Sequence, residues 1–188
     1  MEAARRRADA TQNRARIIHA ARELVVGPDD LKLNEVAKAA GVGQGTLYRH
    51  FPTREDLLVE VYRGDVESLV AAAESLLAEH DPLEALRHWF RRVAEYAQVK
   101  RGVFAAVTSA VQSDLAGHSI GSIGEAITTL LDAGKTDGTV RPDADARDVI
   151  LLIGYLSRLD DAEWDTRAHH LLDIILDGLQ TKAGATKA

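Results

Sequence analysis

Apolar residues recur every three to four positions along most of the chain, the spacing of one face of an α-helix. Between residues 31 and 58 this pattern predicts two short helices and the start of a third. The first has an apolar face of Leu33, Val36, Ala37 and Ala40. Gly41-Val42-Gly43 then interrupts the pattern, and Gly41 suits the left-handed conformation that closes a helix. Two helical segments separated by a tight glycine turn predict a helix-turn-helix.

The second short helix extends from Gln44 to about Phe51, with Gly43 at the position of its cap. If Leu47 and Phe51 point into the core, the helical step turns a polar and basic face outward. That face contains Gly45, Thr46 and Arg49, with Tyr48 and His50 on its flanks. Pro52 ends the helix, and Thr53 with Asp56 three positions later predicts a capping box that starts the next one.

The remaining pattern predicts further helices, so the expected fold is all-α. A mobile tail is expected at Met1–Ala10, whose arginines either reach a DNA minor groove or are simply solvated. Lys100-Arg101-Gly102 is expected to break the helical pattern, and residues 113–124, rich in glycine and serine, have no assigned structure. The predicted helices are Thr11–Val26, Thr53–His80, Leu83–Lys100, Val103–Gln112, Glu125–Ala133, Ala144–Leu159 and Trp164–Lys182.

The last two helices are apolar over more than one face. On the first, Ile150 and Leu151 widen the face, and on the second, Ile174 and Leu176 do the same. Excess apolar surface of this kind favours a second contact, most simply a symmetric homodimer through both helices. A helix pair that is merely well buried is the alternative.

The segment around the glycine turn resembles the DNA-binding region of the TetR family of bacterial repressors. Gly41-Val42, Gly45-Thr46-Leu47-Tyr48, His50-Phe51 and Thr53-Arg54-Glu55 carry the resemblance, which covers roughly residues 11–58. It implies an N-terminal three-helix helix-turn-helix domain at residues 1–58. A long helix joins this to a C-terminal helical bundle for ligand binding and dimerisation at residues 59–188.

The resemblance also implies which side chains meet double-stranded DNA: Thr46, Tyr48, His50 and Arg54 at phosphates, and Gln44 and Arg49 at base edges. The predicted DNA-binding residues are Lys32, Asn34, Gln44, Gly45, Thr46, Tyr48, Arg49, His50 and Arg54. The chain departs from the family pattern at three positions. Lys32 and Gly43 replace hydroxyl caps, and Gln44 replaces a frequent lysine, which favours a bidentate contact to adenine. Tyr48 has an alternative role as a packing residue.

Charge is unevenly distributed along the chain. Residues 1–58 carry ten Lys and Arg against eight Asp and Glu, a net of +2, whereas residues 59–188 carry 13 against 21, a net of −8. Phosphate affinity depends on the local field, so the overall charge of −6 does not argue against DNA binding. The asymmetry fits a DNA-binding segment attached to an acidic body.

The expected function is that of a TetR-like repressor that binds a near-palindromic operator as a homodimer. A small-molecule effector entering the helical body is expected to release it from DNA. Aromatic surface with a few polar groups suits such a pocket. The predicted ligand-binding residues are His88, Trp89, Arg92, Tyr96, Phe104, His118 and Tyr155.

Other classes of protein are disfavoured. The chain contains no cysteine, and its longest apolar run, Val149–Leu156, is too short to span a membrane, so a cytoplasmic protein is expected. Adjacent His169 and His170 point about 100° apart on a helix and do not chelate one metal ion. No hydrolase or metalloprotease motif is present, so neither an enzyme nor a cofactor is expected. A helical scaffold whose helix-turn-helix has lost DNA binding remains an alternative.

Overall fold

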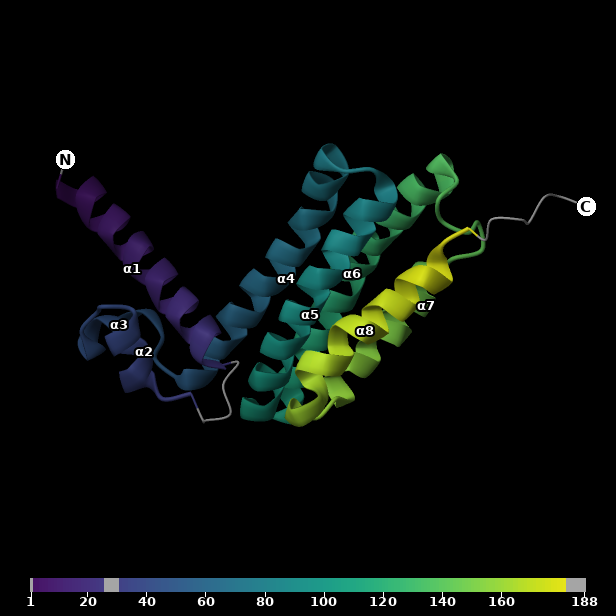
Figure 1. Cartoon of the computed structure of the whole chain (residues 1–188). Helices are drawn as coiled ribbons and strands as arrows, with labels where there is room; N and C mark the ends of the chain where they lie inside the picture. Colours follow the sequence, from purple (N-terminus) through teal and green to yellow (C-terminus); the bar gives the residue numbers. More distant parts are fainter. Residues whose placement is uncertain (1, 26–30, 182–188) are drawn as a thin grey trace, which may run out of the picture. The chain divides into compact units, whose positions relative to one another are not determined.

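The computed structural model of the protein describes residues 2–25 and 31–181, without the side chains of residues 2–7, 118 and 161. The described part is helical apart from loops and one isolated antiparallel bridge between Val140 and Gln180, which confirms the predicted all-α fold (Figure 1). The helices are α1 (Glu2–Val25), α2 (Leu33–Ala39), α3 (Gln44–His50), α4 (Arg54–Glu79), α5 (Pro82–Ala106), α6 (Ser109–Asp137), α7 (Ala146–Gly154), the 3₁₀-helix η1 (Tyr155–Arg158) and α8 (Asp161–Leu179).

The chain forms two compact units that share three of these helices. The first unit comprises Met1–Asp65 and Val99–Leu115, and the second comprises Val66–Gln98 and Ala116–Ala188. The helices α4, α5 and α6 therefore each contribute residues to both units. The domain division after Leu58 stays a prediction.

In the first unit, α1, α2 and α3 lie against one another, as Figure 1 shows. Their common core contains Ile17 of α1, Val36 of α2 and Leu47 of α3, all almost fully buried. Arg22 of α1 donates a 2.7 Å hydrogen bond to the carboxylate of Asp65, which belongs to the part of α4 within this unit. The predicted apolar faces of the helix-turn-helix therefore form its core, except that Leu33 is only half-buried.

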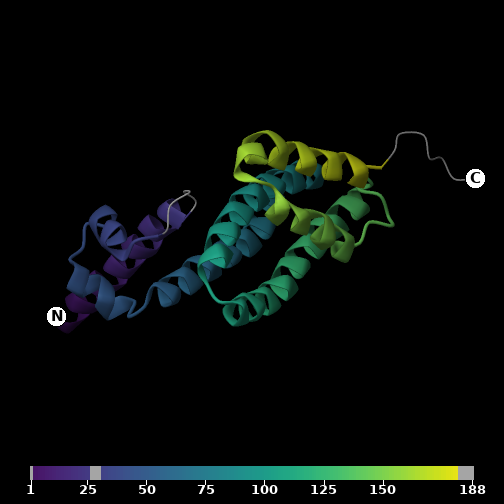
Figure 2. The same cartoon turned by 90° about the horizontal axis from the view of Figure 1, so that it is seen from below.

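In the second unit, α5 is buried over a wide arc. The buried residues on this part of the helix are Ala85, Leu86, Trp89, Phe90, Val93, Ala94, Tyr96 and Ala97. The indole nitrogen of Trp89 donates a 2.9 Å hydrogen bond to the backbone carbonyl of Leu69 in α4, so the one polar atom of this side chain is satisfied inside the core. Helices α7 and α8 pack against each other in the same unit (Figure 2).

The predicted break at Lys100-Arg101-Gly102 is wrong, because α5 continues to Ala106. Gly102 instead provides a close contact within the first unit. A β-carbon at this position would lie only 2.2 Å from the backbone carbonyl oxygen of Val25 in α1. Since no side chain fits in that space, the glycine allows α5 and the end of α1 to approach each other, and the helix continues through it.

The predicted helix Val103–Gln112 is also wrong, because its residues are divided between α5 and α6. The side-chain amide of Gln112 donates to the backbone carbonyls of Phe104, at 2.6 Å, and Val107, at 3.3 Å. These bonds satisfy carbonyls at and just after the end of α5. Residues 113–124, left unassigned, are helical and belong to α6, which continues past the predicted helix end at Ala133 to Asp137.

The ends of the first and last helices also differ from the prediction. The mobile tail expected at Met1–Ala10 is wrong for residues 2–10, which belong to α1. This segment lacks an apolar stripe, yet it is rich in alanine and arginine, which favour a helix even where no face is buried. The predicted Ala144–Leu159 helix is shorter, with α7 followed by η1, and α8 begins three residues before Trp164. The predicted helix ends at Val26 and Lys182 lie outside the described residues.

Candidate nucleic-acid interface

The turn between α2 and α3 is closed by Gly41, whose φ is +63°. The amide of Gly41 donates to the carbonyl of Lys38 at 3.2 Å, and the amide of Val42 donates to the carbonyl of Ala37 at 3.0 Å. This pair of bonds is a Schellman motif, which requires the left-handed conformation that glycine adopts at little cost. The predicted turn is confirmed, and it fixes where α3 begins.

The predicted absence of hydroxyl caps at the starts of α2 and α3 is confirmed. Neither Lys32, before α2, nor Gly43, before α3, makes a side-chain capping hydrogen bond. By contrast, Thr53 and Asp56 form the predicted capping box at the start of α4. The Thr53 amide donates to the Asp56 carboxylate at 3.1 Å, and the Asp56 amide donates to the Thr53 hydroxyl at 3.0 Å.

Burial of one side of α3 determines which side faces outward. Leu47 is 1% exposed and Phe51 2%, and α3 lies against both α1 and α2. Gln44, Gly45 and Arg49 are exposed, and Tyr48 keeps 51% of its surface accessible. Since a ring of that size is normally buried, the exposure disfavours the packing role for Tyr48.

The outward side of α3 is open to a close approach. A β-carbon at Gly43 or Gly45 would meet no other atom within 4 Å. The Arg49 side chain folds along the helix, donating to the carbonyl of Gly45 at 2.9 Å and to the hydroxyl of Thr46 at 3.3 Å. These bonds use part of its five N–H donors, so the remaining donors are available to a ligand.

The other predicted DNA-binding residues lie in the same unit. Thr46, His50 and Arg54 are half-buried, whereas Lys32 and Asn34 are exposed near the start of α2. The Lys32 ammonium pairs with the Glu35 carboxylate at 3.5 Å. At this exposure the ion pair is weak, and it does not prevent the lysine from contacting phosphate.

The predicted ligand-binding residues are dispersed. Trp89 and Tyr96 belong to the core, the ring of His88 stacks on that of His80 with centroids 4.5 Å apart, and Arg92 is exposed. Tyr155 is 68% exposed at the start of η1, and its ring lies under the Arg158 guanidinium.

Phe104 belongs to the first unit, where its ring lies 5.5 Å from that of Tyr62 between centroids. The side chain of His118 lies outside the described residues. The ligand-binding assignment stays a prediction for all seven residues.

Sequence reasoning missed a groove between α4 and α6 in the second unit, which none of these seven residues lines. Its signal in the sequence is the seven-residue spacing of Glu67 and Glu74, two turns apart on one side of α4.

Among the described residues, no group of three or more His, Asp and Glu side chains is placed to hold a metal ion. Among residues 2–25 and 31–181, none of the helices combines the length and the hydropathy that a membrane span requires.

Family models match both parts of the chain. Residues 17–61 match the bacterial regulatory proteins of the tetR family, and residues 81–181 match the C-terminal domain of SbtR-like transcriptional regulators. The second match alone covers more than half of the chain.

Solved structures agree with this assignment. A TetR transcriptional regulator from Streptomyces coelicolor is 38% identical, with a TM-score of 0.80 over 90% of this chain and 99% of its own. A TetR transcription regulatory protein from Mycobacterium vanbaalenii is 31% identical, with a TM-score of 0.75 over 93% of this chain and 99% of its own. An HTH-type transcriptional regulator of Staphylococcus aureus is 33% identical over 84 residues, and the chain spans only 45% of that curated relative.

Proposed function

Because the chain belongs to the TetR family of bacterial transcriptional regulators, we propose that it is a repressor that binds a near-palindromic operator as a homodimer and leaves it when a small molecule binds. The observation that carries this proposal is the outward face of α3. That face combines an exposed tyrosine and arginine with two positions where no side chain limits close approach. A helix with such a face fits the major groove of DNA.

The side chains on this face divide into two roles in the proposal. Tyr48, Thr46 and His50 bind phosphates and fix the position of α3 on the duplex, because hydroxyl and imidazole groups donate well to phosphate oxygens. Gln44 and Arg49 face base edges. The amide of Gln44 suits adenine N6 and N7, and the guanidinium of Arg49 suits guanine O6 and N7.

A dimer through α7 and α8 is supported by the apolar surface that these helices leave uncovered. Leu151 is 60% exposed, Leu152 52% and Ile174 53%. A β-carbon at Gly154 or Gly178 would meet no atom within 4 Å, so backbones of a second copy can approach there. A two-fold dimer presents two α3 helices, which explains a near-palindromic site with half-sites roughly one DNA turn or more apart.

Release by an effector is supported by the continuity of α4, which starts after α3 and extends into the second unit. A ligand in the second unit changes DNA affinity only if it binds the released form more tightly than the DNA-bound form. In this proposal α4 transmits the change from the second unit to the helix-turn-helix.

Retention of genomic DNA fragments by the purified protein tests the proposal. We expect selective retention of fragments that contain a near-palindrome, with an affinity that falls steeply as salt is raised, because phosphate contacts release counterions. The variant Tyr48→Ala/Arg49→Ala is the control, since both side chains are exposed and their loss leaves the core intact. If the ligand-free protein retains no fragment above non-specific DNA at low salt, the repressor proposal fails and a scaffold that has lost DNA binding is favoured.

A further inference from the structure

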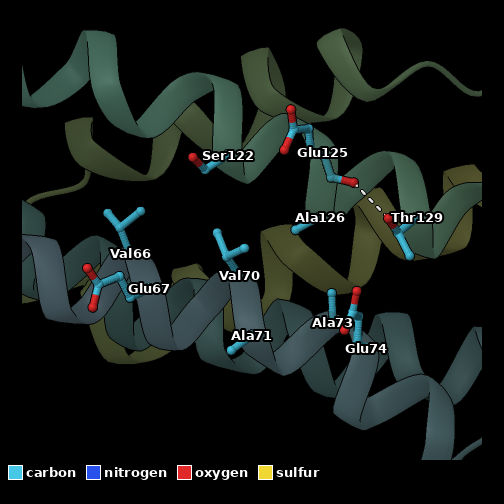
Figure 3. Close-up of a pocket in the computed structure, with 10 residues that line it drawn as sticks. All are labelled: Val66, Glu67, Val70, Ala71, Ala73, Glu74, Ser122, Glu125, Ala126 and Thr129. Atoms are coloured by element: carbon cyan, nitrogen blue, oxygen red, sulfur yellow. Dashed lines mark hydrogen bonds between the residues drawn. The ribbon is translucent and has the colours of Figure 1, made fainter.

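A groove of about 460 Å³ lies between α4 and α6 within the second unit (Figure 3). Its volume falls in the range of small-molecule sites, roughly 300–1,000 Å³. Figure 3 shows α4 residues along one side and α6 residues along the other, with Val66 and Val70 pointing from α4 toward α6. All residues that line the groove belong to the second unit.

The inner surface of the groove is apolar, and small side chains leave it open. Val66 and Val70 are half-buried, and Ala73 of α4 and Ala126 of α6 are buried. Alanine at facing positions leaves room between the helices that larger side chains would fill. The groove therefore offers van der Waals contact to a compact apolar body.

Three carboxylates surround this apolar surface: Glu67 and Glu74 from α4 and Glu125 from α6. Within the described side chains, none of the three forms a salt bridge or accepts a hydrogen bond. The described lining includes no lysine, arginine or histidine. The carboxylates consequently make the potential over the groove negative.

The hydroxyl groups of the lining add to this preference. The Thr129 hydroxyl donates its hydrogen to the backbone carbonyl of Glu125 at 3.0 Å, drawn as a dashed line in Figure 3, so toward a ligand it acts as an acceptor. Ser122 supplies the one further hydroxyl of the described lining. A ligand that donates hydrogen bonds therefore fits better than one that accepts them.

We infer that this groove binds a small organic cation, an ammonium or amidinium group attached to an apolar body, and that such a cation is the effector. The apolar body occupies the surface of Val70, Ala73 and Ala126, and the cationic group lies among the three glutamates. An anionic ligand is repelled by the same charges. The effector role of the cation rests on the proposed function, whereas the binding of the cation in the groove does not.

Three matched probes test the charge preference by calorimetric titration of the DNA-free protein. They are 1-naphthylmethylamine, 1-naphthalenemethanol and 1-naphthoic acid, which share one ring system and differ in charge. We expect the amine to bind about tenfold more tightly than the alcohol and the acid more weakly still, with the difference shrinking as salt increases. Equal affinity for the amine and the acid overturns the inference.

The site is tested with Glu67→Gln, Glu74→Gln and Glu125→Gln, which keep side-chain shape and helix preference. Each is expected to weaken amine binding about three- to fivefold while affinity for the alcohol stays the same. Glu79→Gln is the matched control, because Glu79 is an exposed glutamate on α4 that does not line the groove. If the three substitutions leave the affinity for the amine unchanged, or if Glu79→Gln lowers it equally, the proposed location of the site is wrong.

The effector role is measured separately, by adding the amine to the complex of the protein with a retained DNA fragment. We expect release at amine concentrations that rise in the three glutamine variants in proportion to their loss of affinity. If the amine binds through the glutamates and the DNA complex is unaffected, the effector role is overturned. If no fragment is retained before the amine is added, the repressor proposal has failed instead, and titration of the DNA-free protein still decides the binding site.

Discussion

The outward face of α3 and the exposed side of α7 and α8 both carry large exposed side chains, and they differ in what surrounds those side chains. On α3, Tyr48 is exposed among Gln44, Gly45 and Arg49, so the ring stands on a polar and basic face. On α7 and α8, the exposed side chains are mainly aliphatic, including Leu152 and Ile174. A polar face with one aromatic ring suits hydrated, charged DNA, whereas a mainly aliphatic face suits a partner that excludes water. The difference therefore separates the proposed operator contact from the proposed contact between copies.

The largest expected effect concerns the aliphatic face. Leu152→Glu combined with Ile174→Glu would place two unpaired carboxylates from each copy in the dimer interface, at a cost on the order of 5 kcal/mol or more. We expect a monomer at micromolar concentration, with unchanged helix content because both side chains are already exposed in the single chain. Sedimentation velocity measures the change, and circular dichroism checks the fold.

Ile120→Glu is the matched control for this experiment. Ile120 is 55% exposed, as the other two are, but it belongs to α6. The substitution should leave the sedimentation coefficient of the wild type unchanged. Should Ile120→Glu dissociate the dimer while the double variant stays associated, the interface must involve α6 and not α7 and α8.

The second prediction uses neighbouring residues of α3. Leu47→Ala removes a fully buried side chain from the core of the helix-turn-helix and should lower the free energy of unfolding by about 3 kcal/mol. Tyr48→Ala should change stability little and weaken DNA binding across all sequences by about 2 kcal/mol, because a contact to a charged phosphate is lost. Denaturant unfolding and fragment retention measure the two effects. If Tyr48→Ala lowers the free energy of unfolding as much as Leu47→Ala does, Tyr48 is a packing residue and not a DNA contact.

The helix-turn-helix was predictable because its turns depend on residues whose local chemistry fixes the backbone. Gly41 adopts the left-handed conformation in a Schellman motif, and Thr53 with Asp56 forms a capping box, each within a few positions of sequence. Local patterns of this kind are what a sequence encodes most directly. The same holds for the inward side of α3, since Leu47 and Phe51 are one helical turn apart.

The course of α5 and α6 was not predictable, because it depends on contacts between distant segments. Gly64 and Gly102 are both glycines inside long helices and have the same local propensity. Only the structure separates them: a β-carbon at Gly64 meets nothing, whereas one at Gly102 meets the Val25 backbone. The α4–α6 groove was missed for a similar reason, since it depends on the packing of two helices distant in sequence, and Ser122 of its lining belongs to the segment that the sequence pattern left unassigned. Of the predicted ligand-binding aromatics, Trp89 and Tyr96 are buried in the core, whereas Tyr155 is exposed.

The third prediction concerns base recognition by the polar face. Gln44→Ala should change which fragments are preferred, costing about 1 to 2 kcal/mol on operators that contain adenine at the contacted position and little on others. Selection of bound sequences from a random pool, compared with the wild type, measures this change. A uniform loss of affinity over all sequences would instead place Gln44 at a phosphate.

The smallest effects, about 1 kcal/mol, come from glycines on the two surfaces, Gly45 on α3 and Gly178 on α8. A β-carbon at either position meets no atom in the single chain, so replacement by alanine should stabilise each helix by up to about 1 kcal/mol. If the surfaces are interfaces that approach closely, the same methyl group weakens the complex. We expect Gly45→Ala to lower the affinity for the operator and to leave the dimer association constant unchanged. Gly178→Ala is expected to lower the dimer association constant about tenfold. Denaturant unfolding, fragment retention and sedimentation of both variants measure these effects. If replacing a glycine stabilises the chain and weakens neither complex, that glycine lies outside both contacts.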